Sequence, residues 1–135
     1  MESQMLFIVG ASIFGLLGTL HLVYTFFTHR FDARGAATNA AMRVDHPVLT
    51  RRTTMWKAWI GFNASHSLGA MLFAALYLLL ASRHMPVLHE SPLLAWLGVA
   101  GGLAYLALAW RYWFRTPLIG IALGTACFAL AALLL

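Results

Sequence analysis

The sequence predicts an all-α protein, an integral membrane four-helix bundle that forms one domain over residues 1–135. The chain is 61% hydrophobic and only 10% charged, with a mean hydropathy of +0.79, whereas about 25% of residues are charged in soluble domains. Four apolar runs, at about 5–27, 56–80, 93–110 and 118–135, are long enough to cross or nearly cross a bilayer. Because unpaired backbone groups cannot face lipid, these runs must be helical.

The first run is expected to be a retained span rather than a cleaved signal, because its flank carries Glu2 and no basic residue. The loop that follows, residues 29–54, is the only long connection. Its alanine-rich stretch, 34–44, either forms a short helix on the lipid headgroups that ends before Pro47 or is irregular. Thr50 or Thr53 is the expected N-cap of the second span.

The other two connections are short. In the second loop, the step from Ser91 to Pro92 is typical of a helix start and predicts the beginning of the third span. The third connection, residues 115–117, predicts a tight turn that makes the last two spans an antiparallel hairpin.

The basic residues predict the orientation of the chain. Eight of the nine Lys and Arg residues lie in or beside the first and third loops, which the positive-inside rule assigns to the cytoplasm, so both termini are expected outside it. A nucleic-acid partner is not expected despite the pI near 10.2, because a membrane surface accounts for charges beside span ends. Arg51, Arg52 and Lys57 are expected to meet lipid headgroups.

The second span carries a polar patch in its middle, and polar groups are costly inside a bilayer, so the patch indicates where function lies. Helical geometry divides this span into two faces. One face holds Trp56, Trp59, Asn63, His66 and Ala70, and the opposite face holds Gly61, Ser65 and Gly69. Both are expected to pack against other helices, because small residues allow close approach and polar residues need partners.

Depth in the membrane indicates partners for this patch on other spans. Counted from the expected cytoplasmic helix ends, Tyr105 lies roughly 9 Å deep, His21 roughly 10 Å, Asn63 roughly 13 Å and His66 roughly 18 Å. A polar layer drawn from several spans is therefore expected.

The run RRTTMWKAWIGFNASHSLG, with the histidine of TLHLVY in the first span, resembles an uncharacterised family of small bacterial four-helix integral membrane proteins with an MW...GFNxSH signature. The resemblance rests on these two stretches alone. It implies the four-helix fold and a location in the bacterial inner membrane, and it implies no activity.

Two interpretations of the polar patch stay open. In one, a cavity binds a small amphiphile of the lipid or quinone type, or the surface receives another membrane protein. The residues expected at this site are His21, Trp56, Trp59, Asn63, His66, Ser67 and Tyr105. In the other, the same residues only hydrogen-bond across helices and hold the bundle together.

Some of the same residues suit other functions. His21 and His66 are alternative axial ligands for haem b, against which stands their expected depth difference of roughly 8 Å; no other cofactor or metal is predicted. Gly120 and Gly124 form a dimerisation pattern that suits an oligomeric transporter, although no acid lies within a span to carry a cation. Catalysis is not expected, because the spans offer no carboxylate for acid or base chemistry.

Overall fold

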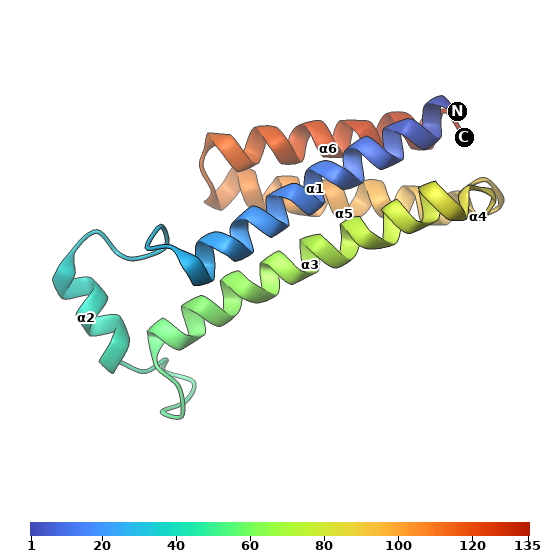
Figure 1. The fold of residues 1–135 in the computed structure, drawn as a ribbon. Helices are drawn as coiled ribbons and strands as arrows, with labels where there is room; N and C mark the ends of the chain where they lie inside the picture. Colours follow the sequence, from blue (N-terminus) through green and yellow to red (C-terminus); the bar gives the residue numbers. More distant parts are fainter. The chain divides into compact units, whose positions relative to one another are not determined.

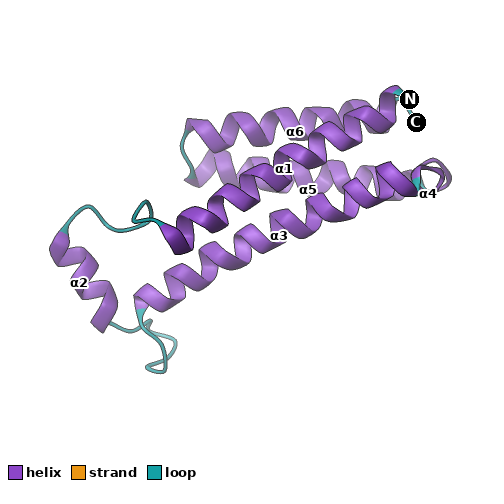
Figure 2. Ribbon diagram, in the orientation of Figure 1, coloured by secondary structure: helices purple, strands orange, loops and turns teal.

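The structure is a computed structural model that describes residues 1–135, and Figure 1 shows the order of its helices. They are α1 (Glu2–Phe27), α2 (Ala36–Val44), α3 (Met55–Arg83), α4 (Met85–Glu90), α5 (Pro92–Tyr112) and α6 (Arg115–Leu133). Loops and turns join them, and no strand is present (Figure 2). The predicted all-α fold class is confirmed.

Four helices, α1, α3, α5 and α6, are long and apolar enough to cross a membrane. Large apolar side chains on their surfaces are exposed, among them Phe62 at 75%, Leu72 at 70% and Trp110 at 81%. Apolar surface of this extent is costly in water and favourable in lipid. Length, composition and surface together indicate a multi-pass membrane protein.

The turn between α5 and α6 differs from the prediction. α5 ends at Tyr112 and α6 begins at Arg115, so the turn consists of Trp113 and Phe114 rather than residues 115–117. Pro117 lies in the first turn of α6, where its missing N–H has no helical partner to lose. α5 begins at Pro92 as predicted, and α5 and α6 pack against each other as the expected hairpin.

Two short helices lie in the connections. α2 covers most of the alanine-rich stretch and ends before Pro47, which confirms the helical alternative for this segment. α4 was not predicted; Pro86 in its first turn helps to start the helix because the backbone angle of proline is preset for one. The loop after α2 is closed at its base by Met55, whose N–H donates to the Asp45 carbonyl over 2.9 Å.

The N-cap of α3 is Thr54, and the prediction of Thr50 or Thr53 was wrong. Thr54 Oγ1 accepts the backbone N–H of Lys57 over 3.3 Å, and its carbonyl accepts the N–H of Ala58. Thr53 instead uses its carbonyl to accept Nδ1–H of His46 over 2.7 Å. Three threonines within five residues, Thr50, Thr53 and Thr54, are all candidate caps, so composition alone could not identify the one that is used.

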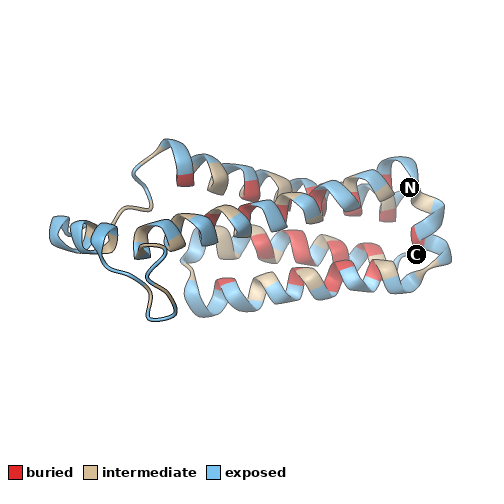
Figure 3. Ribbon diagram, turned by 90° about the horizontal axis from the view of Figure 1, so that it is seen from below, coloured by how far each residue is buried: buried red, intermediate tan, exposed pale blue.

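The chain forms two compact units. Unit 1 comprises Met1–Leu17 and Ala70–Leu135, and unit 2 comprises Gly18–Gly69. Both chain termini belong to unit 1 and lie close together (Figure 1). Buried residues recur along the long helices, whereas α2 in unit 2 has none (Figure 3).

An aromatic core holds unit 1 together. Phe7 and Phe14 of α1 and Phe128 of α6 have exposures of 0%, 1% and 0%. Phe128 meets the ring of Phe7 edge to face at 5.6 Å and that of Tyr77, from α3, at 4.8 Å. Tyr77 also donates its hydroxyl to the Leu94 carbonyl of α5 over 2.7 Å, so its buried polar group is satisfied.

Gly120 and Gly124, which form a dimerisation pattern in the sequence, pack inside unit 1. A Cβ at Gly120 would lie 2.9 Å from Leu17, and one at Gly124 would lie 2.9 Å from Phe14. Both positions therefore let α6 approach α1 of the same chain. The sequence pattern is that of close helix packing in either case, and only the structure identifies which helix is the partner.

Candidate functional site

Asn63 is the centre of a hydrogen-bonded cluster in unit 2. Its side chain is 5% exposed and uses both ends of the amide: Nδ2 donates to the Trp59 carbonyl over 2.8 Å, and Oδ1 accepts from His21 Nε2 over 2.9 Å. The first bond assigns the amide orientation, so the second assigns the Nε2–H tautomer to His21. Asn63 thus links α1 to α3, which is the structural role considered from the sequence.

The two intramembrane histidines lie in contact. The ring centroids of His21 and His66 are 5.3 Å apart and the rings meet edge to face. The depth difference of roughly 8 Å expected from the sequence therefore does not keep the two rings apart. His21 lies six residues before the end of α1, and His66 eleven residues after the start of α3. Because the rings nevertheless meet, the two helix ends are offset, and counts from them have no common origin.

Ser67 and Trp59 complete the cluster. Ser67 is fully buried and donates its hydroxyl to the Asn63 carbonyl over 2.9 Å, so its side chain serves its own helix. Trp59 donates its indole N–H to the Phe31 carbonyl over 3.1 Å. This bond fastens the loop after α1 onto α3, where the Phe31 ring lies 4.6 Å from that of His21.

Tyr105 belongs to unit 1. Its ring packs edge to face on Phe14, with the centroids 5.7 Å apart. Within unit 2, the side chains of the polar layer come from α1 and α3. Tyr105, which was expected in the same layer, lies outside this unit.

The second face of the span does not pack within unit 2 as expected. Gly61 and Ser65 are exposed, and a Cβ at Gly61 would have no atom within 4 Å. The Ser65 hydroxyl bonds to the Phe62 carbonyl of its own helix over 3.0 Å. Small residues permit close approach but do not require it, which is why the sequence pattern overstated the packing of this face.

A pocket of about 290 Å³ lies in unit 2, and its lining residues are different from those of the Asn63 cluster. Its lining residues are Thr25, Phe26, Thr28, His29, Asp32, Arg43, Trp56 and Ile60. They come from the last turns of α1, the loop after it, α2 and the first turns of α3. The pocket therefore combines polar groups with apolar ones where two spans end, which is the composition of small-molecule sites.

Arg43 and Trp56 form one wall of this pocket. The Arg43 guanidinium carbon lies 4.4 Å from the centroid of the Trp56 ring, a cation–π contact that joins α2 to α3. Trp56 is the only residue of the predicted site that lines the pocket. Thr28, His29 and Asp32 were missed because they follow the first span as an ordinary polar stretch, THRFD, and Arg43 was missed because it lies on α2. Thr25, Phe26 and Ile60 lie within α1 and α3 but outside the polar patch on which the predicted site was based.

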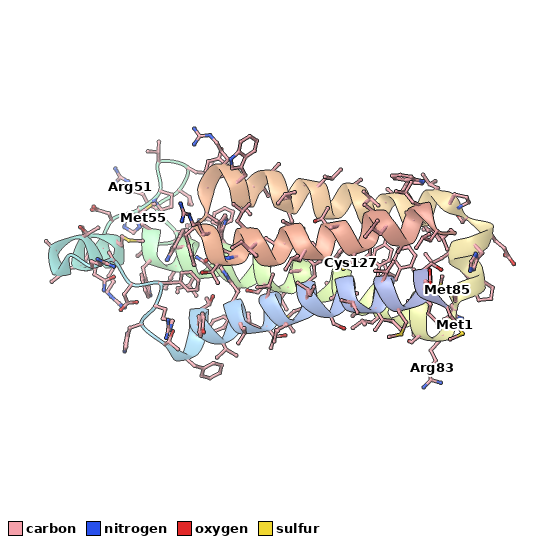
Figure 4. The ribbon with its side chains drawn as sticks, turned by 90° about the horizontal axis from the view of Figure 1, so that it is seen from above. Met1, Arg51, Met55, Arg83, Met85 and Cys127 are labelled. Carbon is pink, nitrogen blue, oxygen red and sulfur yellow. The ribbon has the colours of Figure 1, made fainter.

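The three predicted headgroup residues stay on the surface. Arg51 lies on the loop that leads to Met55, at the start of α3 (Figure 4). Arg52 follows it on the same loop, and Lys57 lies in the first turn of α3. All three are exposed and form no ion pair within the chain. Exposed cations beside the end of a span are well placed for lipid phosphates.

Comparison of the chain with protein-family models, curated proteins and solved structures finds no match. The resemblance to small bacterial four-helix membrane proteins therefore stays a prediction. No group of three or more His, Cys, Asp or Glu side chains lies close enough to hold a metal ion.

Proposed function

We propose that the protein is a membrane-embedded binding protein that takes a small amphiphile of the lipid or quinone type. The observation that carries this proposal is the pocket at the ends of α1 and α3, with its polar and apolar lining. Its volume of about 290 Å³ is at the low end for ligand sites. It suits a headgroup rather than a whole lipid, and the apolar tail would lie along the exposed surface of α1, where Phe26 is 56% exposed.

The depth of the pocket supports the same ligand class. Phe26 precedes the last residue of α1 by one position, and Trp56 is the second residue of α3. In a bilayer these positions belong to the interface, where headgroups lie and where tryptophan is enriched. An amphiphile at this level exposes its head to the polar side chains and its tail to hydrocarbon.

Extraction of bound amphiphiles from the purified protein, followed by mass spectrometry, tests the proposal. Ile60→Trp should fill the pocket and lose the co-purifying amphiphile. Leu68→Trp adds the same bulk to an exposed position of the same helix outside the pocket, and it should retain the amphiphile. Equal amounts bound to both variants, or none bound to the unaltered protein, would overturn the proposal.

The location proposed for this activity is a bacterial inner membrane, with the loops that contain α2 and the α5–α6 turn in the cytoplasm. The distribution of basic residues supports this orientation. The pocket would then open on the cytoplasmic side.

The alternative proposal is a b-type haem on His21 and His66, and the observation that favours it is the 5.3 Å between their rings. Against it, His21 Nε2–H is engaged by Asn63, and axial ligands must approach the iron from opposite faces of the macrocycle. At least one ring would have to turn away to admit it. A reduced-minus-oxidised visible spectrum decides: a Soret band supports haem, and a flat trace from protein purified with haem supplied removes it.

A further inference from the structure

The pocket of unit 2 contains a cation and an anion that do not pair with each other. Arg43 and Asp32 both line it, yet the Asp32 carboxylate contacts His29 Nδ1, over 3.1 Å, and not Arg43. Two opposite charges in one small pocket without a mutual bond can each receive a group of a ligand. A ligand that is complementary to the pocket would therefore carry both an anionic and a cationic group, which is a narrower class than amphiphiles in general.

Arg43 can receive an anionic group. Its guanidinium lies over the Trp56 ring and makes no ion pair or hydrogen bond within the chain. Stacking uses the flat face of the guanidinium and leaves the N–H groups at its edge, which match phosphate or carboxylate oxygens in pairs. The contact with Trp56 also limits the orientations of the side chain, so less entropy is lost on binding.

Asp32 and Thr25 can receive a group that donates hydrogen bonds. The Asp32 side chain is 22% exposed, and the bond from His29 leaves most lone pairs of the carboxylate available. Thr25 donates its hydroxyl hydrogen to the His21 carbonyl over 2.8 Å. What Thr25 offers to a ligand is therefore an oxygen acceptor. Both groups suit an ammonium that carries N–H hydrogens.

We propose that the pocket binds the head of a zwitterionic phospholipid, with the phosphate on Arg43 and a primary ammonium on Asp32 and Thr25. This inference rests on the proposed function and specifies the ligand class of the same site. The lipid is favoured over its free headgroup, because Phe26, Trp56 and Ile60 add apolar surface that only an acyl chain would use. A trimethylated ammonium lacks N–H groups and would leave the Asp32 carboxylate without a donor.

Native mass spectrometry of the delipidated protein in detergent measures this preference. The probes are phosphatidylethanolamine, phosphatidylglycerol and phosphatidylcholine with identical acyl chains. All three carry a phosphate, but the ammonium is primary in the first, absent in the second and trimethylated in the third. We expect phosphatidylethanolamine to bind about fivefold more tightly than either other lipid, the size of one partly exposed ion pair. Free phosphoethanolamine should compete only at far higher concentration; equal competition would overturn the assignment to a lipid.

Two variants assign the charges, each with a matched control outside the pocket. Asp32→Asn should abolish the preference for phosphatidylethanolamine without weakening the binding of phosphatidylglycerol. Asp45→Asn, which removes an exposed acid, should leave that preference unchanged. Arg43→Gln should weaken the binding of all three lipids, and Arg34→Gln should not. Circular dichroism of each variant verifies that the helices are intact.

The outcomes separate this inference from the proposed function. Equal binding of the three lipids would overturn the assignment of a zwitterionic headgroup, and so would a preference for phosphatidylethanolamine that survives in Asp32→Asn. Either result leaves the proposed binding of an amphiphile in place, provided that Ile60→Trp still blocks lipid binding. Binding of all three lipids that Ile60→Trp leaves unchanged overturns both.

Discussion

Asn63 is a buried amide in the middle of a helix that is apolar enough to cross a membrane. Its two hydrogen bonds remove the cost of placing a polar group there, and one of them reaches α1 through His21. Interhelical bonds of this kind contribute little individually, yet removal of one partner leaves the other unsatisfied. The residue is therefore expected to matter for stability whatever the pocket binds.

Replacement of Asn63 by Leu should lower the free energy of unfolding by about 1 kcal/mol, because the His21 N–H loses its acceptor. Thermal unfolding of the delipidated protein in detergent, followed by circular dichroism, measures the loss. Ser65→Ala on the same helix is the control, because that hydroxyl is exposed and bonds only to its own helix. If Asn63→Leu unfolds at the same temperature as the control, the amide does not stabilise the helix pair.

Glycine positions give a second prediction at this scale. A Cβ at Gly98 would lie 2.8 Å from the Phe128 ring and 2.9 Å from that of Tyr77, and both rings are buried. Gly98→Ala should therefore cost about 1–3 kcal/mol through overpacking. Gly61→Ala adds the same methyl group where no atom lies within 4 Å, and alanine favours helix more than glycine does. Unfolding in detergent should reveal a loss for Gly98→Ala only; comparable losses would contradict the packing.

At the scale of single elements, the start of α3 depends on one side chain. Thr54→Ala removes the acceptor of the Lys57 N–H and should destabilise the first turn by about 1 kcal/mol. Thr53→Ala is a matched control, because Thr53 contributes its carbonyl and not its hydroxyl. Amide hydrogen exchange at residues 55–58 should accelerate in the first variant alone. Acceleration in the second instead would restore the cap expected from the sequence.

α2 illustrates how an element without buried residues is held in place. Its own packing contributes no core, and the contact of Arg43 with Trp56 joins it to α3. The same side chain lines the pocket, so under the proposed function the binding of a ligand would be coupled to the position of α2. A ligand anion on Arg43 would strengthen this attachment, since bound ligands stabilise the state to which they bind.

For the whole molecule, orientation in the membrane is the property to test first. With Cys127, which lies midway along α6 (Figure 4), replaced by Ala, a new cysteine at Val87 should react with an impermeant thiol reagent in intact cells. One at Ala37 should react only after the cells are opened, because the basic loop that contains it is expected in the cytoplasm. Both sites are exposed, so accessibility differs only through the membrane. The reverse pattern would invert the proposed topology.

The sequence by itself determined the class of this protein. Hydropathy predicted all four long helices, the alanine-rich stretch permitted α2, and the cost of polar groups in lipid singled out Asn63 and His66. These properties depend on the composition of one segment at a time, so they are legible without knowledge of the neighbours. For the same reason they predicted that Asn63 needs a partner and named His21 among the candidates.

Only the tertiary structure decided which side chains and helices contact one another. The contact of His21 with His66 depends on the offset between α1 and α3, and the partner of Gly124 depends on which helix lies beside α6. The pocket depends on a loop and a short helix that bring Asp32 and Arg43 to Trp56. Such contacts are set by packing and loop closure between distant segments, and no local pattern records them.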